Sequence, residues 1–382
     1  MGLTDGKPGD RHSKRVVREG LPGYSAVAKP VADEHGPCVE PVRYGFRSFD
    51  RQWIIPDNRL INRPNPQLWE SRSDEQIYLT APSDRSPTNG PALTVSSLIP
   101  DLHHYKGSFG GRVFPLWRDR KASAANLPPK LLMFLTEKYG TQVSAEDLFA
   151  YIAGIAAHPA FTARFHDDLS TPGLRIPITG DRNTFAEAAA LGHTIIWLHT
   201  FGERMADPQN GRPAQPPRLP PARRPRIPAS GAIPQEPASM PDSISYDANR
   251  KRLLVGQGYV ENVEPGVWLY EVSGKQILLQ WFSYRKANRE RPIIGDRRTP
   301  SPLGDIQPDH WSAEYTTELI NVLNVLGWLV DLEPAQATLL QKVCDGPAIP
   351  VDELRAAGIL EALAQAKAQA SAGPGLFDFM EA

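Results

Sequence analysis

The chain has 382 residues, enough for two or three domains that each bury a hydrophobic core. Its apolar fraction of 41% and charged fraction of 22% are typical of a globular protein, and no apolar run approaches the roughly 18 residues that a membrane span needs. The formal net charge of −1 excludes a wholly basic nucleic-acid binder, although it permits a locally basic face.

The N-terminus is polar and lacks the apolar region of a signal peptide. The two cysteines, Cys38 and Cys344, make neither a disulfide framework nor a metal-ligand set, so we expect a protein of the reducing cytoplasm. Residues 1–40 are rich in Gly, Pro and charge and have no periodicity, which predicts a disordered N-terminal tail.

Aromatic residues and arginines alternate between positions 43 and 69. The aromatics predict short strands on a core, and the arginines lie close enough in sequence to form one basic surface. Taken singly, the arginines fit a solvated face paired with Asp50 and Asp57, whereas as a group they favour a phosphate or acidic partner. These arginines are Arg43, Arg47, Arg51, Arg59 and Arg63.

A helical core is predicted from Asp147 to Arg204. Apolar steps of three and four predict a helix that stops before His158, a short second helix over 161–169, and a third that begins at Asp181 or Asn183. An extended connector at 173–181 separates the second helix from the third. Short strands at 76–80, 92–95 and 112–117 and a helix within 126–139 complete an α+β part over 41–205.

Eleven prolines lie between Pro208 and Pro241, so residues 206–241 are predicted to form neither helix nor sheet. This segment is either an exposed linker or, because it carries several arginines, a basic arm that lies along a phosphate backbone.

A period-two pattern after Ser243 predicts a small antiparallel sheet with strands at 244–246, 252–255, 259–260, 267–272 and 276–282. The most basic stretch follows, with only Glu290 and Asp296 opposing it. It contains Tyr284, Arg285, Lys286, Arg289, Arg291, Arg297 and Arg298. Such a stretch at the end of a sheet suits phosphate contact with stacking on a base or sugar.

Two helices, over 311–330 and from Gln336 to Val343, are predicted on either side of Glu333–Pro334, and they complete a β-sheet and helical part over 242–345. Residues 346–382 are predicted to form an Ala-rich helix and tail. The expected fold class is α+β, a helical core with small antiparallel sheets.

No catalytic motif stands out. The Asn126-Leu127-Pro128-Pro129 run lacks the aromatic residue of an amino-methyltransferase loop, and no Glu-x-Lys triplet of a metal nuclease occurs. His193 and His199 are six positions apart, which fits a helical metal site poorly, and His166 beside Asp167 is no better. We therefore expect neither a catalytic site nor a metal site in this chain.

Five blocks in one order resemble the C-terminal specificity region of type ISP restriction–modification enzymes and related adenine-specific DNA methyltransferases. The resemblance covers about residues 41–345. The blocks are RYGFRSFDRQWIIPDNRLINRP; GRVFPLW; FAYIAGIAAHPAFTARFHDDL with LRIPITGDRNTFAEAAALGHTIIWLH; GVWLYEV with QWFSYRK; and LEPAQATLLQKV.

The resemblance implies a target-recognition domain of a phage-defence system that binds double-stranded DNA. In that family a methyltransferase domain with S-adenosylmethionine, and in full enzymes a helicase and a nuclease, precede this region, and the target adenine is flipped out for methylation. Those motifs are absent here, so the chain is expected to be non-catalytic alone. The arginines and Lys286 would contact phosphates, and by residue type Gln257, Asn262 and Tyr284 are candidates for base contacts.

Two alternatives stay open at this stage. The first alternative to DNA recognition is a methyltransferase subunit or fragment diverged past recognition, which S-adenosylmethionine binding would reveal. The second is a protein–protein adaptor that does not bind DNA.

Overall fold

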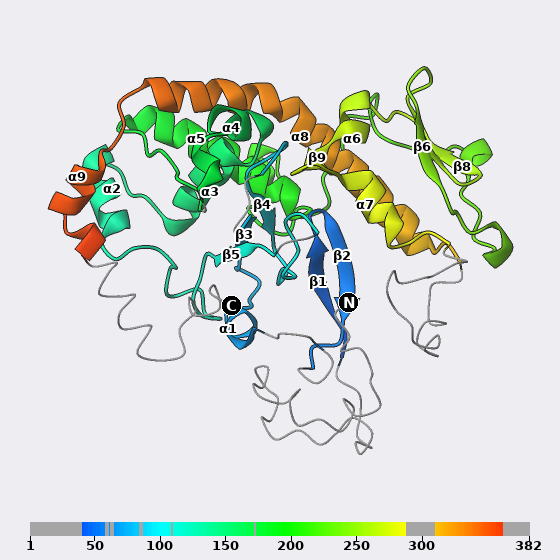
Figure 1. Ribbon diagram of the computed structural model, residues 1–382, viewed down its shortest axis with the longest axis horizontal. Coiled ribbons are helices and arrows are strands. Elements are labelled where there is room, and N and C mark those ends of the chain that lie inside the picture. Colours follow the sequence, from blue (N-terminus) through cyan, green and yellow to red (C-terminus); the bar gives the residue numbers. More distant parts are fainter. Residues whose placement is uncertain are drawn as a thin grey trace, which may run out of the picture.

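A 33-residue helix, α8 (Ala313–Asp345), runs along the upper side of the molecule, and several other helices pack on it (Figure 1). The computed structural model describes residues 40–57, 61, 65–83, 87–107, 110–171, 173–287 and 310–361. The predicted break at Glu333–Pro334 is wrong, because Pro334 lies inside this continuous helix. Proline removes one N–H from the helical ladder, and the packed face of α8 on either side of it offsets that loss.

The predicted helical core is confirmed as α3 (Ala145–Ala156), α4 (Pro159–Arg164) and α5 (Arg182–His199). A capping box of Ser144 and Asp147 starts α3, and Asp181 caps α5 as expected. Two glycines let α3 and α5 approach closely: a Cβ on Gly192 would overlap the Ala150 carbonyl oxygen. Helix α2 (Leu131–Tyr139) precedes this core.

The described part of the chain also forms four small antiparallel sheets, which agrees with the expected α+β class. Strands β1 (Val42–Arg47) and β2 (Asp50–Ile54) form a hairpin. One three-stranded sheet has the order β4-β3-β5 and the other the order β6-β7-β8. Their strands are β3 (Tyr78–Ala81), β4 (Thr94–Ser96), β5 (Arg112–Pro115), β6 (Ile244–Asp247), β7 (Arg252–Val255) and β8 (Gly258–Val260); the short pair is β9 (Glu271–Val272) and β10 (Lys275–Gln276).

Two predicted strands are wrong. The 267–272 run is largely helix α6 (Pro265–Leu269), which begins with a proline at its first position, and the 276–282 run is helix α7 (Ile277–Ser283). The buried residues of α7 are Ile277, Leu278, Trp281 and Phe282, a helical spacing. A short apolar run fits both the helical and the strand periodicity, and in these two segments tertiary packing selects the helix.

The proline-rich segment is held against α8. In it the structure has only 3₁₀ turns, at Pro208–Asn210, Ala229–Gly231 and Pro237–Ser239. Leu219 is buried over Gly327, and its backbone N–H donates to Asn324 Oδ1 at 2.8 Å. The expected absence of α-helix and strand is confirmed, but the segment is a fixed part of the fold.

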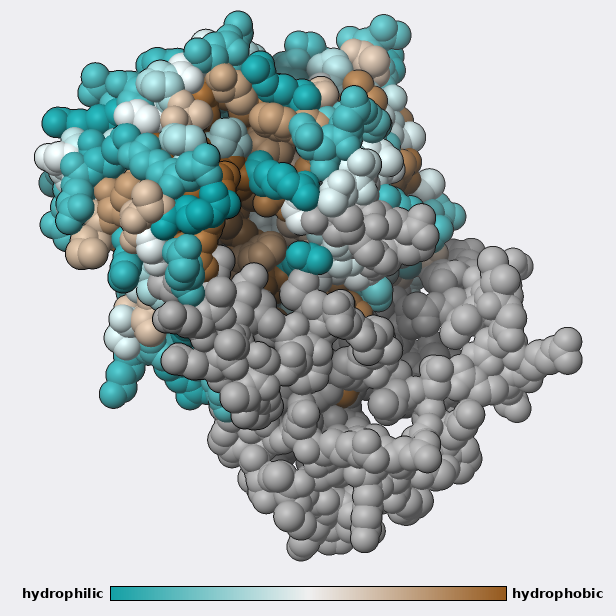
Figure 2. All heavy atoms as spheres, turned by 60° about the vertical axis from the view of Figure 1, so that its left-hand side comes forward, coloured by the Kyte–Doolittle hydropathy of each residue, from teal (hydrophilic) through white to brown (hydrophobic). Residues whose placement is uncertain are grey.

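One hydrophobic core connects residues from Phe49 to Ile359, on both sides of the proline-rich segment. A short helix α1 (Pro66–Glu70) and helix α9 (Val351–Ala356) lie at the edges. Seen from the side of α2 and α9, the surface is mostly polar, with apolar side chains gathered in a hollow at its middle (Figure 2). The predicted tail before Glu40 lies outside the described residues. Within the described part, no helix is long and apolar enough to cross a membrane.

Candidate nucleic-acid interface

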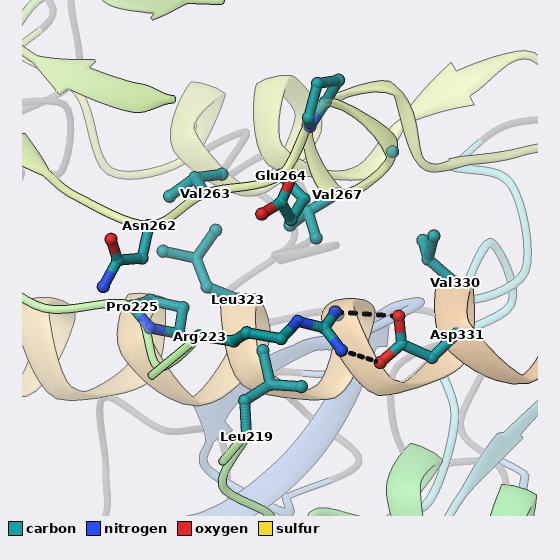
Figure 3. A pocket seen from close by; sticks show the side chains of 13 residues that line it. Leu219, Arg223, Pro225, Asn262, Val263, Glu264, Val267, Leu323, Val330 and Asp331 are labelled. Carbon is teal, nitrogen blue, oxygen red and sulfur yellow. Dashed lines mark hydrogen bonds and ion pairs between the residues drawn. The ribbon is translucent and has the colours of Figure 1, made fainter. Parts of the chain in front are cut away.

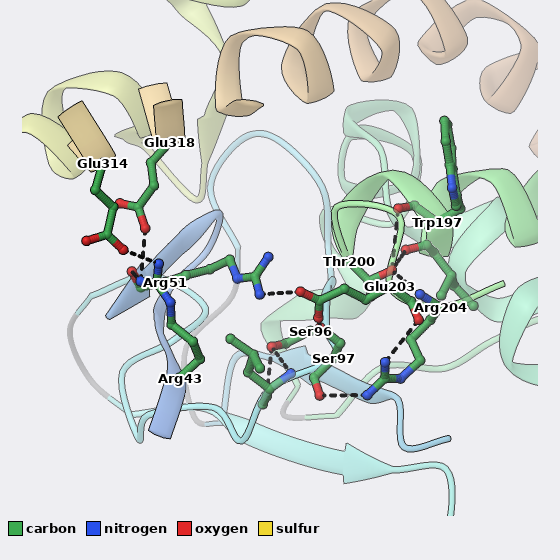
Figure 4. A network of polar contacts seen from close by, with 12 residues as sticks. Arg43, Arg51, Ser96, Ser97, Trp197, Thr200, Glu203, Arg204, Glu314 and Glu318 are labelled. Atoms are coloured by element: carbon green, nitrogen blue, oxygen red, sulfur yellow. Dashed lines mark hydrogen bonds and ion pairs between the residues drawn. The ribbon is translucent and has the colours of Figure 1, made fainter. Parts of the chain in front are cut away.

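The β1–β2 hairpin carries three of the predicted arginines. Arg43 lies opposite Trp53 in the strand register, and its guanidinium stacks on that indole ring with 4.4 Å to the centroid. Arg43 Nη1 contacts Glu318 at 2.9 Å, and its Nη2 pairs with Glu314 (Figure 4). Arg51 pairs with Glu203 in the same network. Both arginines therefore hold the hairpin to neighbouring elements.

Arg47 lies under an aromatic lid. Its guanidinium contacts Asp101 at 2.7 Å and stacks on Phe46 with 3.8 Å to the ring centroid. The ring of Tyr284 packs edge-on against Phe46 at 4.8 Å. Arg47 is buried, whereas Tyr284 is 42% exposed and offers the free side of this stack to solvent.

Arg285 occupies a buried position rather than the surface that the sequence led us to expect. It is 2% exposed, and its Nη2 contacts Asp50 at 2.6 Å and Glu318 at 3.1 Å. Burial alone would lower its pKa, but the two carboxylates outweigh that effect and hold the pKa of Arg285 above its usual value. In this arrangement Arg285 fixes α7 to β2 and α8 and presents no group to a phosphate.

The two basic groups share one region of the molecule, because Arg43 and Arg285 contact the same carboxylate, Glu318. Lys286 follows directly and is exposed. The remaining predicted residues of these groups lie outside the described residues; they are Arg59, Arg63, Arg289, Arg291, Arg297 and Arg298.

The predicted base-contacting residues of the β6–β8 sheet lie elsewhere. Gln257 is exposed at the β7–β8 turn. The sheet of this turn lies to one side of the molecule, apart from β1 and β2 (Figure 1). Asn262 donates from Nδ2 to the carbonyl oxygen of Arg224 at 3.1 Å, so it anchors the proline-rich segment. The structure does not bring these two residues to the hairpin.

Two exposed features were missed by sequence reasoning. Trp53 is 49% exposed, and Arg43 together with a 3.5 Å hydrogen bond to Glu314 holds its ring in place. The second feature is a basic turn at 118–121.

Asp119 organises that turn by accepting backbone hydrogen bonds from Lys121 at 2.7 Å and Ala124 at 2.8 Å. Desolvation alone would raise the pKa of Asp119, but the hydrogen bonds that Asp119 accepts together outweigh that effect and lower the pKa. Within the described ranges Arg118, Arg120 and Lys121 have no carboxylate partner, and all three are exposed. Three basic residues within the four positions 118–121 are a charge cluster that could have been recognised from the sequence.

A mixed α+β domain with an aromatic and basic surface defines the class of this protein. The family described as the Type ISP C-terminal specificity domain matches residues 21–322 of the sequence. The chain therefore belongs to the Type ISP C-terminal specificity domain family, and the resemblance expected from the sequence is confirmed. No curated protein matches the chain by sequence.

Several solved structures share the fold. A nuclease-deletion mutant of the Type ISP restriction–modification enzyme LlaGI, in complex with a DNA substrate mimic, has 14% identity and a TM-score of 0.52 over 84% of this chain and 22% of that chain. A DrdV–DNA complex has 15% identity and a TM-score of 0.54, covering 90% of this chain and 33% of that one. The ATP-dependent Type ISP restriction–modification enzyme LlaBIII bound to DNA has 13% identity and a TM-score of 0.53, covering 81% and 19%.

These identities support a shared fold. The chain spans between 19% and 33% of the length of those three chains, so it corresponds to one part of each of them.

Proposed function

We propose that this chain recognises a double-stranded DNA sequence as the specificity domain of a restriction–modification or adenine-N6 DNA methyltransferase system. The observation that carries the proposal is the family match over residues 21–322. The three structures with the same fold are complexes with DNA or with a DNA substrate mimic, which supports DNA as the partner.

We assign phosphate contacts to the exposed cations, because each unpaired Lys or Arg that meets a phosphate releases condensed counterions. These cations are Arg118, Arg120, Lys121 and Lys286. The paired arginines Arg43, Arg47 and Arg51 would instead keep the hairpin rigid, so that Trp53 and Tyr284 meet the duplex in a fixed position. The phosphate contacts expected of the arginines outside the described residues, and the base contact expected of Gln257, stay predictions.

The chemistry would reside in a partner. A methyltransferase domain or subunit would bind S-adenosylmethionine and methylate the flipped adenine, and a helicase or nuclease would complete a full restriction enzyme. This chain would supply the position of the target base. The alternative of a diverged methyltransferase predicts S-adenosylmethionine binding by the chain itself, which equilibrium dialysis would detect.

The test is selection from a pool of random duplex DNA at several salt concentrations. The wild-type chain should enrich one motif, with affinity falling steeply as salt rises. A variant with Arg118, Arg120 and Lys121 changed to alanine should keep the motif and lose about one unit of salt slope for each phosphate contact removed.

The matched control replaces Arg250 and Lys251, two exposed cations at the β6–β7 turn that already pair with Asp247 and Glu264. It should leave the slope unchanged. Absence of any enriched motif in the wild-type chain would overturn the proposed function.

A further inference from the structure

Two cavities flank the point where α6 rests on α8. Gly266 of α6 sits so close to α8 that a Cβ there would lie 2.9 Å from Val330 Cγ1. Both residues line both cavities, so this contact divides one groove into two chambers. The first chamber has a volume of about 370 Å³ and the second about 570 Å³.

A guanidinium forms part of the wall of the first chamber. Arg223 of the proline-rich segment reaches α8 and binds both oxygens of Asp331, at 2.7 and 2.8 Å (Figure 3). The buried residues Leu219 and Pro225 of the same segment line this chamber. An extended, apolar-flanked arginine is thus the kind of group that this side of α8 accepts.

The second chamber contains the matching carboxylate without the arginine. Glu333 lies two residues after Asp331, lines this chamber, and pairs with no cation in the described part of the chain. Burial raises the pKa of Glu333, as expected for a carboxyl group partly removed from water with no partner.

An exposed apolar side chain accompanies Glu333. The rim of the chamber carries Leu269, which is 65% exposed. A carboxylate beside an exposed apolar side chain suits a cationic donor on an apolar-flanked segment.

We propose that the second chamber receives an arginine or lysine side chain from an extended segment of the methyltransferase-bearing partner. The partner's identity rests on the proposed function, while the chemistry rests on the unpaired Glu333 and on the Arg223–Asp331 pair beside it on α8.

The experiment uses phage-displayed random 12-residue peptides, panned on the full chain and in parallel on Glu333→Gln. Selected peptides should carry Arg or Lys beside Pro or Leu, and their affinity should fall about tenfold on Glu333→Gln. Leu269→Ser should weaken the same peptides, and because that side chain is exposed the variant tests the site without disturbing the core. Glu137→Gln, an acid-to-amide change at an exposed position of α2, is the control and should have no effect.

Three results would overturn the docking proposal: no selected peptide, selected peptides without a basic residue, or full binding to Glu333→Gln. The DNA selection separates this proposal from the proposed function, because Glu333→Gln should enrich the same DNA motif as the wild-type chain. If the chain binds the peptides but enriches no DNA motif, the proposed DNA recognition is overturned, while the proposed binding of a basic side chain in the second chamber is still supported.

Discussion

Arg285 joins three elements, since it lies just past the end of α7 and meets Asp50 of β2 and Glu318 of α8. We expect Arg285→Ala to lower the free energy of unfolding by about 3–5 kcal/mol, because it leaves the carboxylate of Asp50 buried and unpaired. Urea denaturation at neutral pH measures this loss.

Lys286→Ala is the control for Arg285→Ala. The two residues are adjacent, but Lys286 is exposed, so its loss should change stability by less than about 0.5 kcal/mol. A double variant of Arg285→Met with Asp50→Asn should recover part of the loss, because no charge then remains unpaired at that site. If Arg285→Ala and Lys286→Ala have equal free energies of unfolding, the ion pair between Arg285 and Asp50 contributes nothing to stability.

The surroundings of Arg285 were beyond sequence reasoning for a simple reason. Its main partner, Asp50, lies 235 positions away, and counting charges along the chain cannot detect such a pairing. The same holds for Arg43, whose carboxylates come from α8. The arginine-rich hairpin was visible in the sequence, but which arginines stay free for a ligand is decided by the fold.

At the scale of elements, prediction succeeded where local chemistry and periodicity agree. Asp181 and the apolar steps after it define α5, and the turns at 248–250 and 256–257 define the β6–β8 sheet. It failed at α6 and α7, where short apolar runs fit both periods, and at Pro334, where packing of a long helix outweighs a local breaker.

The α3–α5 contact depends on Gly192. We expect Gly192→Ala to lower the free energy of unfolding by about 3 kcal/mol or more, because the added methyl group would overlap the backbone of Ala150 and force the two helices apart. Gly140→Ala is the comparison: its φ is +63° with open space around it, so it should lose only about 1–2 kcal/mol. Thermal unfolding of both variants should rank them in this order, and the reverse order would contradict the close packing.

Pro334 offers the opposite test on α8. Pro334→Ala would restore the N–H that bonds the carbonyl of Val330, and we expect stability to rise by about 1–3 kcal/mol. If Pro334→Ala and the wild-type chain have the same melting temperature, the Val330 carbonyl already has a hydrogen-bond partner in the wild-type chain.

Among the described residues of the whole molecule, three histidines are buried: His104, His158 and His199. Burial is the main cause in each case: it lowers the pKa of His104 and of His199 to about 3 and that of His158 to about 4. The unfolded chain binds protons at these rings near pH 6.5, while the folded chain does not. Stability from these groups is therefore complete above pH 6.5 and falls as the pH drops toward 4.

At one pH unit below the ordinary histidine pKa, each buried ring lowers the free energy of unfolding by about 1.4 kcal/mol. The three rings together should therefore lower it by about 4 kcal/mol between pH 7.5 and pH 5.5. Urea midpoints across this range measure the decline, which should be one cooperative transition because the core is continuous. His158→Leu should reduce the decline by about a third, since the other two rings remain. A midpoint that stays constant down to pH 5.5 would show that the buried rings bind protons without unfolding, and the core would then have to open locally to admit them.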